Sequence, residues 1–594
     1  MRNRRLSAVP GPVIVSAFLL AFILSATTAG SAQTANLVQL SLDPFVNTQS
    51  QHQTEVEPGA FAYGNTIVTA FQVARIYSGG GADIGYATSN DGGKTWTNGL
   101  LPGLTIFYQG GTNSAASDAA VAYDAKHGMW LISTLPIGNN DLVATSRSSD
   151  GLTWSNPVLV TSTIDSDKNW ITCDNWPMSP FYGNCYTQWD SPGQGDLMYM
   201  STSTDGGATW GAAKTSANRV SGIGGQPLVL PNGTVVVSFA DFNGNMSAYT
   251  STNGGSSWGS SVTIASAPSR GEDGGLRSAG LPSAAMDGGG TIYMSWPDCG
   301  FRSGCSENDI VYSTSTDGVH WSAKLRVPID PVTSTVDHFI HGLGIDPNTA
   351  GATAHLGLAY YFYPNGNCGN SCSLRQGYIE SSDGGTTWTS PAQLGGPMQL
   401  SWLPNTFSGV MVADYTATVF ANGKGFPIFA LAYPQISLST PFRESIFTIR
   451  HASDLLPSNG LRFSAAQDKP VPGVKGTRVW EYYDLDHKWP IHPGTVPVPS
   501  KPDNDLDLFL KHFRPLSNQR PLSLRETSRQ TRSGSRGYPP YSSHRLNTRQ
   551  PLVPPKPNEF VMAYSITTLR AVLGTKSRSQ PSPGLSRFTV GGTI

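Results

Sequence analysis

The sequence predicts an all-β protein made of repeated four-stranded sheets, and three observations support this prediction. One short turn motif recurs six times, at intervals of 48 to 66 residues. Runs of alternating apolar and polar residues, such as Thr234 to Phe239, lie between the copies, and a period of two indicates β-strands. The 65 glycines, 22 tyrosines and 14 tryptophans suit strands joined by tight turns. Together, these features predict the four-stranded blades of a β-propeller.

The turn motif follows the pattern Ser-x-Asp-x-Gly-x-x-Trp, shortened by one residue in two copies and with Asn in place of Asp in one. Its Asp can accept backbone N–H bonds from the turn, its Gly allows a positive φ, and its Trp can lie against the sheet. We therefore predict a structural role for the motif and no chemistry for its Asp residues. The copies are Ser89–Trp96, Ser148–Trp154, Ser203–Trp210, Ser251–Trp258, Ser315–Trp321 and Ser381–Trp388.

This motif resembles the Asp-box, or BNR repeat, of sialidases and related β-propellers, over roughly residues 50 to 450. The resemblance implies a secreted, exo-acting glycoside hydrolase that acts on extracellular glycans. Because Asp boxes also occur in propellers that bind without catalysing, it equally allows a non-catalytic propeller that binds a glycan or a protein. We favour the hydrolase and keep the binding propeller as the alternative.

The number of blades is predicted from the polar residues that open each repeat. Six motifs indicate six blades, but seven openings are present, and the seventh, at Asp414, is followed by strand-like segments without a motif. We prefer seven blades, the last completed by the N-terminal alternating run Leu37 to Leu42. Such a closure would remove an exposed sheet edge.

The two ends of the chain differ from its middle. Residues 1–32 combine Arg2, Arg4 and Arg5 with an apolar run and small residues ending at Ala32, a pattern typical of a cleaved secretory signal peptide. An uncleaved membrane anchor is the less favoured alternative. Residues 33–455 are the expected propeller, and 456–594 a Pro/Ser/Arg-rich, largely disordered extension, with 15 Lys/Arg against 5 Asp/Glu in residues 501–594.

The six cysteines fall into three close pairs, which fit short-loop disulfides in an exported protein better than zinc ligation. The pairs are Cys173 with Cys185, Cys299 with Cys305, and Cys368 with Cys372. A net charge of −1, with 13% charged residues, gives no sign of a nucleic-acid binder. We expect a secreted monomer with a glycan ligand, no metal or other cofactor, and no stable membrane insertion.

Candidate site residues open the repeats, because the first residues of innermost strands face the axis of a propeller. Carboxylates and arginines gathered there can hold a sugar and supply a general acid. The alternative is that they lock neighbouring sheets together, since buried polar groups need partners whatever their function. The candidate catalytic residues are Asp118, Asp167, Asp414, Arg277 and Arg302, and the candidate substrate-binding residues are Glu57, Arg75, Asp298, Asp337, His338 and Trp170.

The resemblance to sialidases is partial at the residue level. Where the family has Arg-Ile-Pro, this chain has Glu55-Val56-Glu57-Pro58, so one of the three arginines that hold the carboxylate of sialic acid is missing. The resemblance implies Arg75 as a later arginine, Asp83 as the acid/base, and a tyrosine nucleophile from a strand that holds three tyrosines, for which no Glu partner can be placed. The three are Tyr360, Tyr361 and Tyr363.

Two further groups of residues bear on the site. Asp298 and Arg302 lie around the Cys299–Cys305 loop, and Trp170 and Trp176 lie near Cys173. The tryptophans either stack on sugar rings or fill the space between blades. His338 and His341 are expected on opposite faces of one strand, which disfavours shared metal ligation.

Overall fold

The computed structural model describes residues 36–138, 142–161, 165–278, 280–436, 442–450, 462–464, 468–474, 483–484 and 488–490. The chain forms two units, Met1–Ser500 and Lys501–Ile594, and every described residue belongs to the first. The predicted signal peptide and most of the predicted C-terminal extension lie outside the described residues. No helix in the part of the chain that is described is long and apolar enough to cross a membrane.

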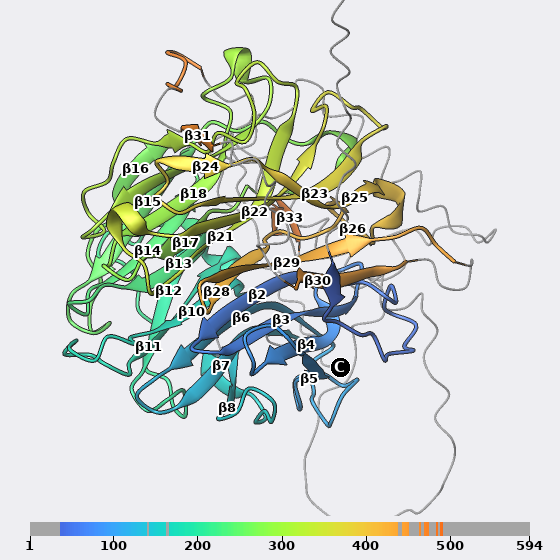
Figure 1. Cartoon of the computed structure of the whole chain (residues 1–594). Coiled ribbons are helices and arrows are strands. Elements are labelled where there is room, and N and C mark those ends of the chain that lie inside the picture. The colour runs from blue at the N-terminus through green and yellow to red at the C-terminus, as the bar shows by residue number, and fades with distance from the viewer. Residues whose placement is uncertain are drawn as a thin grey trace, which may run out of the picture. The chain divides into compact units, whose positions relative to one another are not determined.

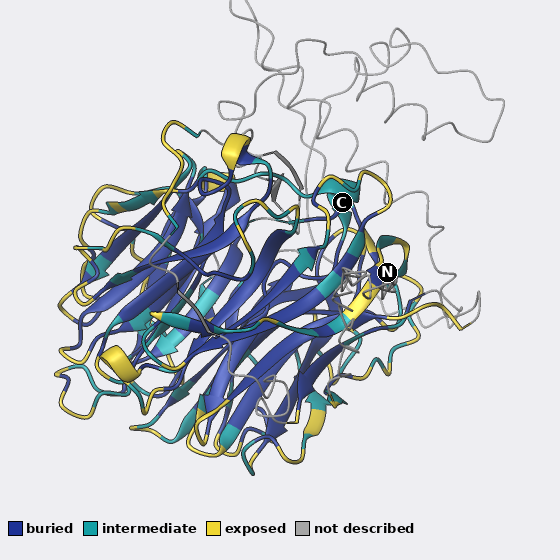
Figure 2. Cartoon of the chain, turned by 45° about the horizontal axis from the view of Figure 1, so that its top comes forward, coloured by how far each residue is buried: buried dark blue, intermediate teal, exposed yellow. Residues whose placement is uncertain are grey.

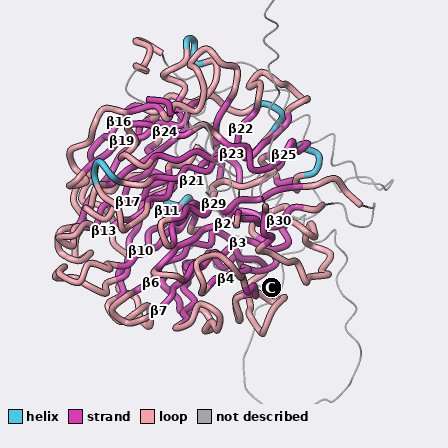
Figure 3. The backbone as a smooth tube through the Cα atoms, in the orientation of Figure 1, coloured by secondary structure: helices cyan, strands magenta, loops and turns pink. Residues whose placement is uncertain are grey.

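The described residues are built from antiparallel β-strands, and their helices are three-residue 3-10 turns (Figure 3). Seven groups of strands follow one another along the chain, and we call them the first to seventh sheets. A single bridge, Gly81 to Ala116, joins the first two. The prediction of an all-β protein is confirmed.

The first four sheets run in chain order. They contain β2 (Glu55–Tyr63), β3 (Thr66–Arg75), β4 (Gly81–Ser89) and β5 (Thr97–Leu100); then β6 (Ala115–Asp124), β7 (Met129–Ile137), β8 (Val143–Ser148) and β9 (Val158–Thr161); then β10 (Asp167–Cys173), β11 (Cys185–Ser191) and β12 (Leu197–Ser203); then β13 (Gly222–Val229), β14 (Val235–Asp241), β15 (Asn245–Ser251) and β16 (Val262–Ser266).

The remaining sheets complete the series. They contain β17 (Ser283–Met286), β18 (Ile292–Asp298), β19 (Asp309–Ser315) and β20 (Leu325–Arg326); then β21 (Asp337–Ile345), β22 (Leu356–Tyr363), β23 (Ser373–Ser381) and β25 (Ala392–Gln399); then β28 (Ala417–Ala421), β29 (Lys424–Ala432), β30 (Glu444–Ile449) and β1 (Leu37–Gln39). Smaller pairs join β24 (Thr387–Thr389) to β31 (Arg462–Ser464), β26 (Asn405–Thr406) to β27 (Gly409–Val410), and β32 (Tyr483–Asp484) to β33 (Lys488–Pro490).

The seventh sheet joins the two ends of the repeat region. Strand β1 pairs antiparallel with β30, so that Leu37 lies opposite Ile449. Figure 1 shows β29 and β30, in orange, beside the blue strands β2 and β3. The prediction that an N-terminal strand completes the last group of strands is therefore confirmed.

The first strands of the sheets contact one another in a closed cycle. Contacts run from β2 to β6, β10, β13, β17, β21 and β28, and from β28 back to β2. Figure 2 shows that buried residues predominate in the strands and that the exposed residues are concentrated in the connecting loops. The polar residues that open the repeats therefore lie on, or shortly before, strands that contact a neighbouring strand on each side.

Five of these first strands carry a β-bulge near their start, at β2, β6, β10, β13 and β21. In each bulge one residue has a positive φ: Glu57 (56°), Asp118 (49°), Lys168 (46°), Gly224 (64°) and Ile340 (41°). A non-glycine residue with positive φ is uncommon and costs energy. The same local distortion therefore recurs around the cycle, and in three cases the distorted residue is charged.

The turn motifs form the hydrogen bonds that the sequence predicts. In the first copy, Asp91 Oδ1 accepts from the backbone N–H groups of Lys94 and Thr95 at 3.0 and 2.9 Å, while Ser89 Oγ accepts from Gly93 N at 2.8 Å. Hydrogen bonds from Thr95 hold the pKa of Asp91 well below its usual range. Such a carboxylate is a fixed acceptor rather than a proton donor, as predicted.

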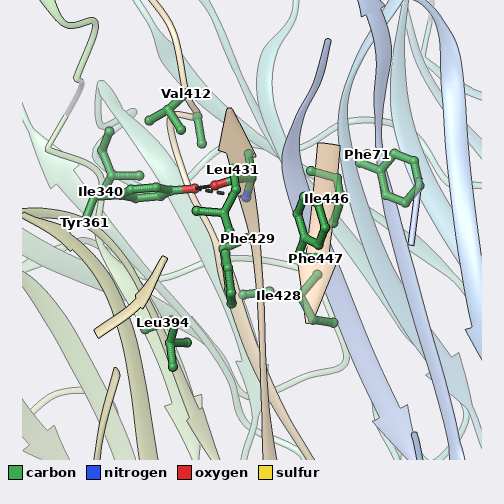
Figure 4. Packing of buried hydrophobic residues seen from close by; sticks show 14 of the residues in the cluster. Phe71, Ile340, Tyr361, Leu394, Val412, Ile428, Phe429, Leu431, Ile446 and Phe447 are labelled. Atoms are coloured by element: carbon green, nitrogen blue, oxygen red, sulfur yellow. Dashed lines mark hydrogen bonds between the residues drawn. The ribbon is translucent and has the colours of Figure 1, made fainter. Parts of the chain in front are cut away.

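Apolar side chains fill the spaces between the sheets. The largest cluster includes Phe71 of the first sheet, Tyr361 of the sixth, and Phe429 and Phe447 of the seventh (Figure 4). Tyr361 Oη donates to Ala430 O at 2.7 Å, which ties the sixth sheet to the seventh. The core therefore also packs across the seam where the chain closes on itself.

The three predicted disulfides are confirmed: Cys173–Cys185, Cys299–Cys305 and Cys368–Cys372. The first joins the end of β10 to the start of β11, and the other two close short loops. Three disulfides are typical of proteins that fold outside the reducing cytosol.

Candidate functional site

Six buried charged residues gather where the first strands of several sheets begin, and we call them the central cluster. They are Glu57 on β2, Asp118 on β6, Asp167 and Lys168 on β10, Arg277 before β17, and Asp414 before β28. Their exposed fractions are at most 3%. Residues that are up to 357 positions apart in the sequence therefore form one site.

Lys168 lies among three carboxylates. Its Nζ is 3.1 Å from Asp414 Oδ2, 3.3 Å from Asp118 Oδ2 and 3.7 Å from Asp167 Oδ1. Its backbone N–H also donates to Asp118 Oδ2 and Asp167 Oδ1. The left-handed conformation of Lys168 lets its backbone and its side chain contact the same carboxylates.

Arg277 is the second cation of the central cluster. Its Nε and Nη2 donate to the two oxygens of Asp414 at 2.9 and 2.5 Å, a bidentate arrangement that fits a guanidinium to a carboxylate. Its Nη2 also lies 3.9 Å from Glu57 Oε1. Asp414 thus receives charge-assisted hydrogen bonds from Arg277 and an ion pair from Lys168.

Neutral side chains extend this network to Arg75. Gln72 Nε2 donates to Glu57 Oε2 and to Ser117 Oγ, and Arg75 Nη1 donates to Gln72 Oε1 at 2.7 Å. Ser117 Oγ in turn donates to Asp118 Oδ1 at 2.6 Å. The first and second sheets are therefore linked through polar side chains as well as through apolar packing.

A small pocket, with room for about one water molecule, lies beside the central cluster. Lys168, Asn169 and Trp170 of β10 contribute to it, together with Gly224, Gln226, Leu281, Pro282 and Tyr415. The rings of Trp170 and Tyr415 meet edge to face, with centroids 5.4 Å apart. The walls are mostly apolar, and Lys168 is the charged residue among those that line the pocket.

The structure brings together some of the predicted site residues. Five of them belong to the central cluster: Asp118, Asp167, Asp414, Arg277 and Glu57. Arg75 is linked to the cluster through Gln72, and Trp170 lines the pocket. Sequence reasoning did not select Lys168, Asn169 or Tyr415 as site residues, although the first two directly follow Asp167 and Tyr415 directly follows Asp414. The position of these residues at the start of a repeat could have identified them, but only the carboxylates and arginines there were selected.

Arg302 and His338 belong to a separate network at the fifth sheet. Arg302 and Arg326 both pair with Asp309 and Asp330, with N–O distances of 2.5 to 2.9 Å. His338 Nε2 lies 3.9 Å from Asp330 Oδ2. The ligand atoms of Asp309, Asp330 and His338 are close enough to surround a metal ion, but the two guanidinium groups already occupy the carboxylates.

Asp298 and Asp337 are fixed by local contacts. Asp298 pairs with Lys324 at 2.5 Å and accepts from Gly300 N, which holds the turn that precedes the Cys299–Cys305 loop. Asp337 accepts from Asn308 N at 2.6 Å and pairs with Arg270 at 3.3 Å. Burial, followed by the charge of Glu272, raises the pKa of Asp337 well above its usual range.

The expectation that His338 and His341 face opposite sides of their strand is wrong. The bulge at Ile340 interrupts the alternation of side chains along β21. As a result His338 contacts Asn308 and His341 contacts Ser295, both from the fifth-sheet region. The two rings nevertheless have different partners.

Three further buried carboxyl groups stand outside the central cluster. They are Asp83, Glu55 and Glu444. Burial raises the pKa of Asp83 well above its usual range and raises the pKa of Glu55 to about 8. The pKa of Glu444 is also raised well above its usual range, by burial and then by the nearby Glu55. Among the described residues, Asp83 Oδ2 and both oxygens of Glu444 receive no hydrogen bond. Burial therefore favours the neutral form of all three carboxyl groups.

The three tyrosines of β22 are poor nucleophiles. Burial raises the pKa of Tyr360, Tyr361 and Tyr363 above the ordinary value in each case. Tyr361 also uses its hydroxyl to bind the backbone of Ala430. A phenol that burial keeps neutral does not match the nucleophile that the family resemblance implies.

No protein-family model matches the sequence, and no curated protein matches it. Among solved structures, a Dyadobacter fermentans protein of unknown function is similar at 15% identity and a TM-score of 0.39, covering 59% of this chain and 100% of its own. The NanB sialidase of Streptococcus pneumoniae is similar at 14% identity and a TM-score of 0.35, covering 70% of this chain and 71% of its own. A leech intramolecular trans-sialidase, complexed with 2,7-anhydro-Neu5Ac, is similar at 13% identity and 0.34, with coverage of 72% and 70%. Scores this low carry no argument about the function of this chain.

Proposed function

We propose that this protein is a secreted, sialidase-like β-propeller with seven blades that binds glycans beside its central cluster. The closed cycle of contacts between first strands supports seven blades, as does the completion of the seventh sheet by β1. The three disulfides support export. A signal peptide over residues 1–32, a propeller over 33–455 and an extension over 456–594 complete the proposal.

The pairing of the central carboxylates carries the choice of binding over hydrolysis. A glycosidase needs one carboxyl group that can donate a proton and a second group that can act as base or nucleophile. Here Asp118, Asp167 and Asp414 are buried around Lys168, and Asp414 is also held by Arg277. Carboxylates compensated in this way are suited to locking the blades together.

The test is glycan-array binding with the purified mature chain, starting at residue 33. We expect binding that is lost in Trp170→Ala, because the indole forms one wall of the pocket. Exposed Met178→Ala is the matched control, since Met178 is 92% exposed and lies eight residues further along the chain. Absence of binding to every glycan on the array would refute the proposal.

Glycoside hydrolysis remains the second candidate because of one observation. Asp83, which the family resemblance assigns to acid/base catalysis, is a buried carboxyl group whose pKa is raised by burial, and one of its oxygens receives no hydrogen bond from a described residue. A screen of aryl glycosides, including a sialoside, would detect turnover. Activity that disappears in Asp83→Asn, or in the Asn variants of Asp118, Asp167 and Asp414, would establish a hydrolase, whereas absence of turnover alongside glycan binding would support the first candidate.

A further inference from the structure

Four aromatic side chains form a row between the first and second sheets. They are Phe61 and Tyr63 on β2, Tyr123 on β6 and Trp130 on β7. The ring centroids of Phe61 and Trp130 are 6.4 Å apart, and those of Trp130 and Tyr123 are 4.8 Å apart. The ring of Tyr123 in turn lies 4.4 Å from that of Tyr63. Each ring therefore contacts the next, and we call the last two, Tyr63 and Tyr123, the tyrosine platform.

The row leads from the core of the two sheets to the surface. Trp130 is 3% exposed, Tyr123 is half-buried, and Tyr63 is 46% exposed. Tyr123 covers one face of Tyr63, because the planes of the two rings are inclined by only 32° at this short separation. The exposure of Tyr63 therefore comes from its opposite face and its edge, so one ring face is open to solvent.

The tyrosine platform lies at the end of the sheets away from the central cluster. Glu57 and Tyr63 are six residues apart on β2. A strand advances about 3.3 Å per residue, so these two residues are about 20 Å apart. A ligand on the tyrosine platform would therefore not contact the central cluster.

Hydrogen bonds fix the backbone on both sides of the tyrosine platform. Gly92 N, in the first turn motif, donates to Asn65 O at 2.9 Å and holds the hairpin that carries Tyr63. Asn175 Nδ2, from the loop after β10, donates to Tyr123 O at 2.8 Å. The two rings are thus presented by anchored strand ends, which limits the entropy that a ligand would have to offset.

Uncharged polar groups border the open ring face. The hydroxyl groups of Tyr63 and Tyr123 make no hydrogen bond to a described residue. Burial raises the pKa of Tyr123, and the nearby Tyr63, Asp124 and Tyr182 add to this effect, so its phenol stays neutral. Exposed Lys126 donates from Nζ to Tyr182 O at 3.0 Å and has further hydrogens to donate.

The size of the tyrosine platform favours a small ligand over a protein. A stable protein interface covers about 800 Å² on each partner, whereas a whole aromatic side chain buries only about 150–250 Å². The exposed residues around it are not apolar: Gly64 and Asn65 at one hairpin, and Lys126 and His127 at the next. A sugar residue fits such a surface, because it has an apolar C–H face for a ring and hydroxyl groups for the polar border.

We propose that the tyrosine platform is a second glycan-binding site, on which a neutral sugar residue of a polysaccharide stacks against the open face of Tyr63. The inference does not depend on a ligand beside the central cluster. One stacked sugar binds weakly, with a dissociation constant of roughly 1 mM, so this contact serves retention on a polysaccharide with many copies of the sugar. Binding this weak falls below what a glycan array retains.

Affinity electrophoresis of the mature chain, in gels that contain galactomannan, dextran or hydroxyethylcellulose, measures such binding. We expect at least one of these neutral polysaccharides to retard the protein, and Tyr63→Ala to weaken this binding about tenfold. Tyr63→Phe, which keeps the ring, should bind within about threefold of the unaltered protein. The control is Tyr77→Ala, at a 54% exposed tyrosine between β3 and β4, which should bind unchanged.

A second measurement uses the unaltered protein and does not depend on the folding of a variant. Nitration with tetranitromethane, followed by mass spectrometry, should modify Tyr63 less when oligosaccharides of the retarding polysaccharide are present, whereas Tyr77 should react equally. No retardation by any of the three polysaccharides, undiminished retardation of Tyr63→Ala, or equal nitration of Tyr63 would overturn the inference. Retardation that Trp170→Ala abolishes and Tyr63→Ala preserves would overturn it too, while supporting the site beside the central cluster.

Discussion

Lys168 compensates the charge of three buried carboxylates in the central cluster. Its side chain is 2% exposed, and its three acidic neighbours come from three different sheets or their leading segments. Removing one partner from a buried ion pair is more damaging than replacing the whole pair, because the remaining charges stay buried and uncompensated. The stability of the central cluster should therefore depend on this ammonium group.

We expect Lys168→Met to lower the free energy of unfolding by about 3–5 kcal/mol. Urea denaturation followed by tryptophan fluorescence measures this loss. Lys94→Met, at an exposed position in the first turn motif, should change stability by less than about 0.5 kcal/mol. An equally small effect at Lys168 would show that the cluster does not depend on its cation.

The turn motif provides its own internal comparison at a second residue. In the fourth copy Asn253 replaces Asp, yet its Oδ1 still accepts from Ser257 N and from Ser251 Oγ at 3.0 Å. Asp205→Asn in the third copy should therefore cost little, whereas Asp205→Ala should cost about 1–2 kcal/mol because it removes the acceptor for Thr209. Thermal unfolding of the two variants compares them, and an equal loss in both would show that the amide oxygen of Asn cannot replace the carboxylate as the acceptor.

Among the elements, β1 stands out because it pairs with a strand that lies more than 400 residues further along the chain. Two contacts beyond the strand strengthen the pairing: Leu40 N donates to Ile446 O at 2.8 Å, and Ser41 Oγ accepts from Ile446 N at the same distance. Without β1, the edge of β30 would be exposed.

We expect Leu40→Pro to increase hydrogen exchange at the amides of β30, because proline cannot donate to Ile446. Leu40→Ala separates this effect from the loss of the buried side chain, and should leave exchange in β30 closer to wild type. Leu42→Pro, at a side chain that is 62% exposed, is the control for proline itself. Unchanged exchange in Leu40→Pro would mean that β1 is not needed to protect the seventh sheet.

The repeated strands and turns could be predicted from the sequence because their determinants are local. Alternation of apolar residues, the Asp and Gly of each turn, and close cysteine pairs all act within a few residues of one another. The position of β1 could also be predicted, because a last group of strands without a motif lacked an outer partner.

The site could be predicted only in part, because its geometry arises from bulges and long-range pairing. The bulges hold three charged residues in left-handed backbone conformations that no sequence pattern indicates: Glu57, Asp118 and Lys168. Asp298, Arg302 and Asp337 share the residue types of the cluster, yet local partners hold them elsewhere. Residue type and repeat position together identified the cluster, but they could not determine which carboxylate pairs with which cation.

For the whole molecule, the seam between the first and seventh sheets should make stability depend on pH. Burial raises the pKa of Glu55 to about 8, and the charge of Asp43 adds to this effect. Burial and the nearby Glu55 also raise the pKa of Glu444 at the same seam. A carboxyl group whose folded-state pKa is raised stabilises the fold at low pH and loses this contribution as the pH rises through the folded value. His341 acts in the opposite sense, but only between its folded pKa of about 4 and its ordinary value of 6.5.

We therefore expect the free energy of unfolding to fall by about 2 kcal/mol from Glu55 alone between pH 6.5 and 8. Denaturation measured across this range tests the expectation. Glu55→Gln, which mimics the neutral acid, should flatten the dependence, and a slope that is the same in this variant would show that Glu55 does not contribute.

The pairing of Leu37 with Ile449 also has a consequence for the order of events during synthesis. Strand β1 must wait until more than 400 further residues have been made, so it cannot pair with β30 before Ile449 has left the ribosome. Contacts between residues this distant in sequence form slowly. The first and last strands of the repeat region therefore stay unpaired with each other through most of its synthesis.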